Sequence, residues 1–354
     1  MGNSTVYSKI IYSRQPVAEL TLLTAKYPEG KVFLVTEDNV DKLWGEHFDN
    51  FIDSEGIRKV VIPSGENNKK IDSVAKIWQF LSENGADRKS LLINIGGGML
   101  TDLAGFAAST FKRGIHFLNV PTTLLSQVDA SVGGKTGINF NGLKNEIGTF
   151  QEPEAVIINT GFLKTIDTEN FKSGFAEMIK HGLIHNPSHL EDLKNFDLQN
   201  IDYDLLQQLI NDSVDVKTWF VSNDPTEKDI RKALNFGHTV GHAFESFAME
   251  KGTPILHGFA VAYGMIAELY LSVKKCGFPE ADCNELSAWL KEIYGKFVIG
   301  EDSFERLYKL MTHDKKNESG RINFTLLPET GKIAIDQHCE KELIMEALKY
   351  YRNL

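Results

Sequence analysis

A row of polar residues at helical spacing occurs in the segment 231–245, which reads RKALNFGHTVGHAFE. Its members are Arg231, Asn235, His238 and His242. Because the separations are four, three and four positions, one continuous helix would place all of them on the same face. Two histidines four positions apart can share a metal ion, but Thr239 stands where a zinc protease has its catalytic glutamate, so that chemistry is excluded. Burying four polar groups in a packing stripe is costly, so the row indicates a functional site.

Two further segments carry candidate metal ligands. In GFAEMIKHG, a helix would bring Glu177, Lys180 and His181 to one face, although a surface ion pair between the first two is the common alternative. In ILHGFAVAYGM, His257 opens a strongly apolar helix, where a capping role and a ligand role fit about equally well. One carboxylate and two histidines would leave zinc an open coordination position, as in catalytic sites.

Cationic residues lie in or beside these polar motifs and a glycine-rich motif. They are Lys135, Lys144, Lys180, Lys217, Arg231 and the pair Lys315 and Lys316. Each of them alone is typical of a solvated surface charge. Their number in a chain of net charge −10 favours a pocket for a small substrate that carries several negative charges.

A glycine turn at 96–98 separates the apolar run Leu91–Ile95 from a segment with apolar residues at helical spacing. A strand, a glycine turn and a helix start can cradle a phosphate, because the backbone approaches closely and the first N–H groups of the helix point at the anion. The motif is GGG and not G-x-G-x-x-G, so a tight structural connection is an equal alternative. Beyond the next expected strand, Ile115–Val120, a glycine-rich loop carries Lys135, Lys144 and Asn145.

The segments that must position these residues begin with an alternating pattern. Apolar strands are expected at Lys31–Thr36, Arg58–Ile62 and Glu154–Ile158, with amphipathic helices between the strands. This alternation predicts a parallel sheet with helices on its faces. Asp38, after the first of these strands, either takes the ribose hydroxyls of an adenine cofactor or caps the following helix, and from its position the cap is favoured.

The second half of the chain has a different predicted secondary structure. From Thr168 to about Met311 nearly every segment predicts a helix, and a strand pair at Arg321–Leu327 and Lys332–Ile335 precedes a terminal helix. The fold class expected is therefore α/β, with an N-terminal Rossmann-like parallel-sheet domain, a C-terminal mainly α-helical domain and a boundary near residue 165.

Composition limits the classes of function. The chain has 354 residues, of which 42% are hydrophobic and 24% charged, as in ordinary globular proteins. A net charge of −10 argues against nucleic acid or an anionic membrane as partner. Three scattered cysteines, no apolar signal core and no run of about 18 apolar residues lead us to expect a cytoplasmic protein without a membrane span.

Four long motifs together resemble the 3-dehydroquinate synthases, within the sugar-phosphate cyclases. They are GGGMLTDLAGF, NVPTTLLSQVDASVGGKTGIN, NEIGTF and LNFGHTVGHAFE, and they occur in the family's order. The resemblance runs over roughly residues 30 to 340. It implies an NAD-binding Rossmann-like domain over 1–165, a helical metal- and substrate-binding domain over 166–354, and an active site in the cleft between them.

The resemblance also implies two cofactors, NAD and a divalent metal, usually zinc, with cobalt as an alternative. The implied metal ligands are Glu177, His238 and His257, which leaves His242 as a substrate contact. The implied NAD-binding residues are Asp38, Ser64, Gly65, Glu66, Lys69, Gly97, Gly98, Asp102, Thr122, Thr123, Asp129, Lys135, Lys144, Phe162 and Thr165.

The positions that surround the substrate in the family are matched by Asp129, Lys135, Asn145, Lys180, Lys217, Arg231, Asn235, His242 and one of Lys315 or Lys316. By the resemblance, Lys217 and Arg231 bind a carboxylate. Lys135, Asn145, Asn235, His242 and the late lysine lie near a phosphate. Arg113 matches an arginine that reaches the phosphate site of a neighbouring subunit, which implies a functional homodimer.

The reaction implied converts 3-deoxy-D-arabino-heptulosonate 7-phosphate to 3-dehydroquinate and phosphate, a step of the shikimate pathway to aromatic amino acids. NAD takes hydride from C5 while the metal polarises the developing ketone; phosphate then leaves and NADH returns its hydride. Ring opening and an aldol closure complete a lyase reaction without net redox change. Phosphate acting as its own base would explain why no obvious general base stands out.

Departures and rivals are few. Ser64 stands where the family often has Asp, and the frequent Tyr before Lys69 is missing, which affects a detail of nucleotide contact. Sister cyclases, such as 2-deoxy-scyllo-inosose or valiolone-type synthases, would not need the cations Lys217 and Arg231. A polyol dehydrogenase of the glycerol dehydrogenase kind would release NADH and would not need so many cations. A non-catalytic NAD-binding protein would leave the combination of one glutamate and two histidines without a function.

Overall fold

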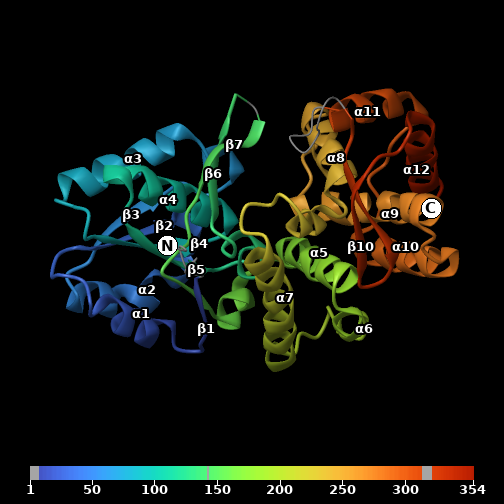
Figure 1. Ribbon diagram of the computed structural model, residues 1–354. Coiled ribbons are helices and arrows are strands. Elements are labelled where there is room, and N and C mark those ends of the chain that lie inside the picture. Colours follow the sequence, from blue (N-terminus) through green and yellow to red (C-terminus); the bar gives the residue numbers. More distant parts are fainter. Residues whose placement is uncertain (1–7, 142, 313–320) are drawn as a thin grey trace, which may run out of the picture. The chain divides into compact units, whose positions relative to one another are not determined.

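A computed structural model describes residues 8–141, 143–312 and 321–354 of the chain. The chain forms two compact units, Met1–Asp167 and Thr168–Leu354, coloured blue to green and green to red in Figure 1. Each unit is described by itself below. Their secondary structure has the predicted α/β and mainly helical character.

The N-terminal unit is built on a six-stranded parallel sheet with the strand order β1-β8-β5-β4-β2-β3. The strands are β1 (Lys9–Tyr12), β2 (Val32–Glu37), β3 (Arg58–Ile62), β4 (Leu91–Gly96), β5 (His116–Pro121) and β8 (Ala155–Ile158). Strands β2 and β4 are buried along their whole length. Apolar residues at successive positions of a strand point to opposite faces, so these continuous apolar runs require cover on both sides of the sheet.

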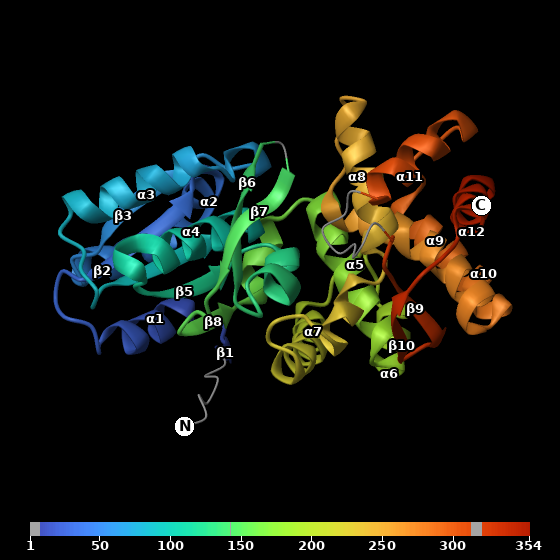
Figure 2. The same ribbon diagram turned by 45° about the horizontal axis from the view of Figure 1, so that its top comes forward.

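Helices provide this cover on both faces of the sheet (Figures 1 and 2). They are α1 (Pro16–Thr24), α2 (Asp38–Ser54), α3 (Ile71–Glu83) and α4 (Gly98–Thr110). Phe33 and Val35 of β2 pack in one core with α3 and α4, whereas Val32 and Leu34 pack in a second core with α1 and α2. The sheet is therefore doubly wound, as predicted.

The strand order reverses at β2, which lies between β3 and β4. The carboxyl ends of β2 and β4 are therefore neighbours, and the chain leaves them in opposite directions along the sheet. Ligands of doubly wound sheets bind at such a topological switch point. Glu37 ends β2 and Asp38 follows it, and the glycine turn lies at the end of β4, so both candidate nucleotide motifs lie at this edge.

One expectation for the N-terminal unit was wrong, and one strand was missed. The glycine-rich segment with Lys135, Lys144 and Asn145 is not a loop but an antiparallel hairpin of β6 (Lys135–Phe140) and β7 (Leu143–Phe150), drawn in green in Figures 1 and 2. Strand β6 packs against α4. Gly137 and Gly148 permit this pairing, because a Cβ on Gly148 would lie 2.3 Å from the carbonyl oxygen of Thr136. The edge strand β1 was not predicted at all.

The C-terminal unit consists mainly of helices. They are α5 (Thr168–Ile184), α6 (Pro187–Lys194), α7 (Tyr203–Asn223), α8 (His238–Glu250), α9 (His257–Cys276), α10 (Glu280–Tyr294), α11 (Phe304–Thr312) and α12 (Lys341–Asn353). The antiparallel pair β9 (Phe324–Glu329) and β10 (Lys332–Gln337) matches the predicted late strand pair. Among the described helices, none is both long and apolar enough to cross a bilayer.

The continuous helix expected over 231–245 does not form. Residues Ile230–Asn235 form a short 3-10 helix, η5, and α8 begins only at His238. Between them Gly237 has a left-handed backbone (φ 79°), and a Cβ there would lie 2.5 Å from Cγ of Met265 in α9. Close packing against α9 therefore breaks the helix and separates Arg231 and Asn235 from the two histidines.

Helices α8 and α9 pack together through glycines. A Cβ on Gly264 would lie 1.9 Å from the carbonyl oxygen of Gly237, and one on Gly241 would lie 2.9 Å from that of Ala260. Small residues let two helix backbones approach closely. The first residues of the two helices, His238 and His257, are brought together by this contact.

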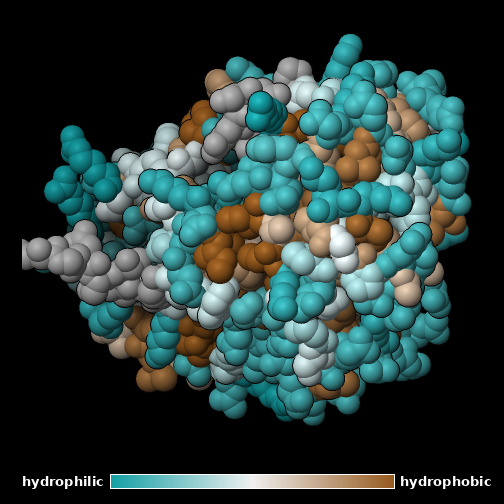
Figure 3. Space-filling model, turned by 45° about the vertical axis from the view of Figure 1, so that its right-hand side comes forward, coloured by the Kyte–Doolittle hydropathy of each residue, from teal (hydrophilic) through white to brown (hydrophobic). Residues whose placement is uncertain are grey.

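Polar side chains cover most of the molecular face in Figure 3, and hydrophobic residues form smaller groups among them. Separate exposed apolar residues are usual in globular proteins.

The buried histidine of α6 predicts a pH-dependent stability. His189 is 1% exposed, and neither ring nitrogen has a hydrogen-bond partner among the described residues. Burial lowers its pKa from 6.5 to about 4, against a smaller opposite effect of Asp192. Between these two values the unfolded chain binds a proton that the folded chain does not, so stability falls as the pH drops through this window, by up to about 3 kcal/mol.

Urea unfolding at several pH values between 4 and 7 measures this effect. The variant His189→Gln has no titrating side chain at this position, so its stability should change less with pH than that of the parent. Identical pH profiles for the two proteins would contradict the assignment.

Candidate active site

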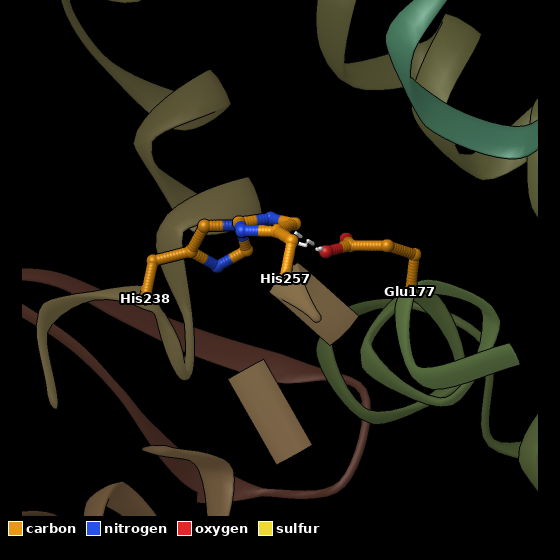
Figure 4. A group of neighbouring side chains, drawn as sticks. All are labelled: Glu177, His238 and His257. Carbon is orange, nitrogen blue, oxygen red and sulfur yellow. Dashed lines mark ion pairs between the residues drawn. The ribbon is translucent and has the colours of Figure 1, made fainter. Parts of the chain in front are cut away.

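Three helices of the C-terminal unit each present one candidate metal ligand. Glu177 lies within α5, whereas His238 and His257 are the first residues of α8 and α9. The Oε1 atom of Glu177 is 3.6 Å from Nε2 of His238 and 3.5 Å from Nε2 of His257. Figure 4 shows the three side chains pointing toward one another. Ligands about 2.0–2.1 Å from a tetrahedral zinc ion are roughly 3.4 Å apart, so the separations suit such an ion.

The other ring nitrogen of each histidine faces an acceptor. Nδ1 of His238 is 3.1 Å from the carbonyl oxygen of Phe236, and Nδ1 of His257 is 3.6 Å from Oε2 of Glu245. A carbonyl oxygen only accepts hydrogen bonds, so Nδ1 of His238 acts as a donor, whereas the contact between Nδ1 of His257 and Glu245 is an ion pair. Both Nε2 atoms face Glu177. Metal-bound histidines have this second contact in most proteins. The donor set and its surroundings therefore fit a divalent metal ion.

The pKa of His257 is strongly perturbed. Burial would lower its pKa, but the hydrogen bonds and charges of Glu177 and Glu245 raise it to about 9. At neutral pH the imidazole is therefore protonated when no ion is bound. A metal ion must displace this proton, because only the neutral ring can bind it.

The pair Glu177 and Lys180 is buried, so the alternative of a surface ion pair was wrong. Their side chains are 0% and 1% exposed, and Nζ of Lys180 donates to Oε2 of Glu177. This leaves Oε1 of Glu177 directed at the histidines. His181, on the same helix, contacts Oγ of Ser213 in α7 through Nδ1 at 2.7 Å. Lys180 is thus part of the Glu177 cluster. His181 also lies close to Glu177, with ligand atoms of the two side chains within 4.8 Å of each other, while its Nδ1 contacts α7.

Two predicted carboxylate-binding cations are also buried in this unit. Arg231 is 2% exposed and Lys217, in α7, is 6% exposed. The backbone N–H of Arg231 donates to Oδ2 of Asp224 at 3.2 Å, and its Nη1 donates to the carbonyl oxygen of Pro225 at 2.8 Å. Helix α7 packs against η5. Both cations are therefore held in the interior by elements that pack together.

The remaining predicted residues of this unit differ in their surroundings. Nδ2 of Asn235 donates to Oε1 of Glu227 at 2.9 Å. The ring of His242 lies one turn after His238, with centroid distances of 5.4 Å to His238 and 5.9 Å to His257. His242 therefore borders the ligand cluster without belonging to the group of three whose ligand atoms lie within 4.8 Å of one another. Lys315 and Lys316 lie outside the described residues.

In the N-terminal unit, the switch point of the sheet contains a buried carboxylate that the sequence had not singled out. Oε2 of Glu37 accepts the N–H of Gly97 at 2.8 Å. Burial raises the pKa of Glu37, the bond from Gly97 lowers it, and the charge of Asp38 raises it again. The exposed Asp38 accepts the N–H of Ser64 at 3.0 Å, and the bonds from Ser64 lower its pKa. These contacts join the carboxyl ends of three neighbouring strands.

The start of α4 fits a phosphate group. Gly97 precedes the helix and Gly98 begins it, and within these described residues no side chain caps the helix and no acidic residue occupies its first turn. A Cβ on Gly97 would lie 3.2 Å from Cγ2 of Thr123, and one on Gly98 would lie 3.1 Å from Cβ of Ala130. The turn is therefore tight, and Glu37 accepts the N–H of Gly97, while no side chain caps α4 itself. The phosphate-binding interpretation of the glycines stays a prediction.

A buried lysine connects the loop after β3 with α4 and the hairpin. Nζ of Lys69 donates to Oδ2 of Asp102 at 2.6 Å and to Oδ1 of Asn145 at 2.5 Å. Burial raises the pKa of Asp102, whereas Lys69 lowers it. Asn139 adds two bonds, from its N–H to the carbonyl oxygen of Lys69 and from Nδ2 to Oε1 of Glu66, both 2.8 Å long. Four predicted residues are therefore joined in one network.

The other predicted residues of this unit differ in their surroundings. Thr122 and Thr123 follow β5 beside the glycine turn, where the N–H of Thr122 donates to the carbonyl oxygen of Gly96 at 2.9 Å. Phe162 is 2% exposed and packs in the core beneath α2, so its ring is not available to a ligand. Oγ1 of Thr165 accepts from Nε1 of Trp44 at 3.0 Å. The exposed or half-buried positions are Gly65, Asp129, Lys135, Lys144 and Arg113.

Three polar residues with evident roles were missed in the sequence. Glu245 lies seven positions after His238, a helical spacing that could have identified it. Glu37 ends an apolar strand, where a carboxylate is unusual. Asn139 offered no signal, because the hairpin that places it was not recognised.

Comparisons with known proteins agree over the two halves of the chain. Family models described as 3-dehydroquinate synthase N-terminal and 3-dehydroquinate synthase C-terminal match residues 59–173 and 174–317. The chain is 47% identical over 344 residues to a 3-dehydroquinate synthase of Parabacteroides distasonis, covering 97% of this chain and 98% of the relative.

Two solved structures share the fold. A 2-epi-5-epi-valiolone synthase from Streptomyces hygroscopicus subsp. jinggangensis, with NAD+ and Zn2+ bound, has a TM-score of 0.86 and 22% identity, and covers 100% of this chain and 99% of its own. A 2-deoxy-scyllo-inosose synthase complexed with carbaglucose-6-phosphate, NAD+ and Co2+ has a TM-score of 0.84 and 23% identity, and covers 97% and 96%. At these identities the likeness shows the fold alone.

The geometry predicts which histidines bind a metal ion. Replacing His257 by alanine removes one ligand of the three and should weaken binding by at least about 100-fold, more than the usual loss of an outer partner. His242→Ala is the matched control, because this ring borders the cluster but is outside the group of three. Titration with Co2+, followed by its visible absorption, measures both variants. Equal losses in the two variants, or normal binding by His257→Ala, would contradict the ligand assignment.

Proposed function

The chain belongs to the 3-dehydroquinate synthase family, and we propose that it converts 3-deoxy-D-arabino-heptulosonate 7-phosphate to 3-dehydroquinate and phosphate. The observation that carries this proposal is the group formed by Glu177, His238 and His257, together with two buried cations in the same unit. The 47% identity over nearly the whole chain supports the same activity. In metabolism we place the reaction in the shikimate pathway.

The proposal assigns a divalent ion, zinc or cobalt, to Glu177, His238 and His257. When bound, such an ion polarises oxygen atoms of a substrate. Glu177 supplies the negative charge of the set, and the buried ammonium group of Lys180 fixes its second oxygen. Glu245 and the Phe236 carbonyl orient the two imidazole rings, so their Nε2 atoms face one point.

NAD is the second proposed cofactor, and when bound it supplies a reversible hydride acceptor. The N-terminal unit would hold it at the switch point, where the start of α4, which no side chain caps, suits the pyrophosphate. Asp38, Lys69 and Thr122 are proposed nucleotide contacts, with the other predicted residues of the same edge. Phe162 could contribute only backbone atoms, because its ring lies in the core.

The substrate carries a carboxylate and a phosphate, and we assign them to different cations. Arg231 and Lys217, both buried in the C-terminal unit, would bind the carboxylate, as they do in the family. Lys135, Asn145, Asn235 and His242 are proposed for the phosphate, together with one of the lysines 315 and 316, which lie outside the described residues. Asp129 is proposed as a further substrate contact. These roles rest on the family resemblance.

A turnover experiment separates this function from its rivals. Protein, NAD+, zinc and the heptulosonate phosphate are mixed, and phosphate release and NADH absorbance are followed together. We expect phosphate and 3-dehydroquinate in equal amounts without accumulation of NADH, because the cofactor is regenerated. NADH that accumulates without phosphate would establish a polyol dehydrogenase instead. Phosphate release only from a carboxylate-free sugar phosphate would establish a sister cyclase.

The carboxylate assignment is tested in the same assay. Arg231→Ala should lower kcat/KM roughly 10–100-fold, the loss typical of a charged hydrogen bond. Arg306→Ala, which removes an exposed arginine of α11 paired with Glu250, is the control and should retain turnover.

A homodimer is part of the proposal, with Arg113 reaching the substrate of the partner subunit. Arg113 is exposed and has a left-handed backbone, as does the preceding Lys112 (φ 69° and 49°), a costly conformation often found at functional sites. The hairpin of the same unit exposes apolar residues. Phe140 and Leu143 lie opposite one another and are 43% and 55% exposed, which supports an interface there.

Light scattering after gel filtration tests the dimer. The double variant Phe140→Glu/Leu143→Glu should be monomeric, because it places charge on the proposed interface. Leu22→Glu, in α1, is the control, since this residue is 74% exposed and lies outside the hairpin. A monomeric parent, or a dimeric double variant, would contradict the proposed interface.

The compartment is proposed as the cytoplasm. Cys276, Cys283 and Cys339 are free thiols in the structure, which is usual for proteins of reducing compartments. Fractionation of lysed cells should recover the enzyme in the cytosolic fraction.

A further inference from the structure

A buried carboxylate, that of Glu268, lies near His238, the first residue of α8. Glu268, within α9, is 0% exposed, and its side chain reaches the start of α8. Oε2 accepts the N–H of Gly237 at 2.6 Å, and Oε1 accepts the N–H of Val240 at 3.0 Å. Both oxygens therefore bind N–H groups that flank His238. The sequence had not singled this residue out, because it lies in an apolar helix eleven positions after His257.

One peptide unit connects this carboxylate with the imidazole ring of His238. The N–H of the Phe236–Gly237 peptide points to Glu268, and the carbonyl oxygen of the same peptide lies 3.1 Å from Nδ1 of His238. A peptide unit is planar, so fixing its N–H also fixes the direction of its carbonyl. A charged acceptor on the N–H also strengthens the hydrogen bond at the carbonyl, because neighbouring bonds polarise one another.

We propose that Glu268 is a positioning residue for the metal centre: through the Phe236–Gly237 peptide it holds the ring of His238 with Nε2 toward Glu177. The inference rests on the proposed metal-dependent function. Glu268 would orient the ring of His238 indirectly, through the peptide unit. The ring of His257 faces its carboxylate directly, because Nδ1 lies 3.6 Å from Oε2 of Glu245. Each candidate histidine ligand then has one buried carboxylate behind it.

Helix α8 has no side-chain cap from the residue that precedes it, Gly237. Residues that precede a helix commonly cap it with a short polar side chain, but position 237 must be glycine, because a Cβ would meet Cγ of Met265 at 2.5 Å and the backbone has φ 79°. The first turn of α8 also contains no acidic residue. Glu268 thus provides from a neighbouring helix the negative charge that suits a helix start.

The test compares two buried polar residues of α9. Glu268→Gln keeps the shape of the side chain but leaves only one oxygen for two N–H groups. Ser272→Ala is the matched control: Ser272 is also 0% exposed, lies one turn later, and accepts the N–H of Leu327 in β9 at 3.0 Å, away from α8. The parent and both variants are titrated with Co2+, and the visible absorption of the bound ion is recorded. Thermal unfolding of each protein measures the structural cost.

We expect Glu268→Gln to bind Co2+ about 10–100-fold more weakly and with an altered absorption spectrum, as for other residues that orient metal-bound histidines. Ser272→Ala should lose stability but retain the parent's affinity and spectrum. Parent-like binding by Glu268→Gln would overturn the inference, and so would an equal loss of affinity in both variants. A parent that binds no Co2+ would overturn the proposed metal centre itself.

A second variant covers the case in which Glu268→Gln does not fold. Glu268→Asp keeps the charge but is one methylene shorter, so it can reach at most one of the two N–H groups. Its affinity should fall below that of Ser272→Ala. An affinity equal to the parent's would overturn the inference.

Discussion

The approach of one buried carboxylate oxygen to two imidazole nitrogens organises the C-terminal unit. Glu177 is completely buried, and isolation of such a charge is costly unless cations or donors compensate it. Lys180 on one oxygen and the two histidines beside the other provide this compensation. The three elements that carry them, α5, α8 and α9, must therefore meet at one place, and the glycines between α8 and α9 make that meeting close enough.

The N-terminal unit follows a comparable logic at the edge of its sheet. Parallel strands end at the same edge of the sheet. The shared strand direction alone therefore brings together the residues at the ends of β2, β3 and β4. Glu37 binds the glycine turn and Asp38 binds the loop after β3. These bonds hold the backbone of a nucleotide edge in place before any ligand arrives, which reduces the ordering cost of binding.

The sequence predicted what depends on local pattern. Alternating strands and helices gave the doubly wound sheet, and the types of Glu177, His238 and His257 indicated metal chemistry. The choice between His242 and His257 needed the family resemblance, because spacing along one helix favours His242 whereas the ring that joins the group of three comes from another helix. The break at Gly237 was not predictable, since its cause is a contact with Met265 in α9.

Other features also depended on tertiary contacts. Segment 135–150 has glycines and cations typical of a loop, and its pairing as a hairpin requires the packing of β6 on α4. Glu268 and Glu245 are single acidic residues in helical segments, where a surface position is the usual expectation. Their burial, and therefore their contacts near the two histidines, depends on how α8 and α9 pack.

X-ray absorption at the zinc edge tests the central claim most directly. If Glu177, His238 and His257 bind the ion, the zinc-loaded protein should show two imidazole ligands at about 2.0–2.1 Å together with oxygen ligands. Scattering from sulfur, or from a single imidazole, would contradict the account, because the ion would then be bound elsewhere in the chain.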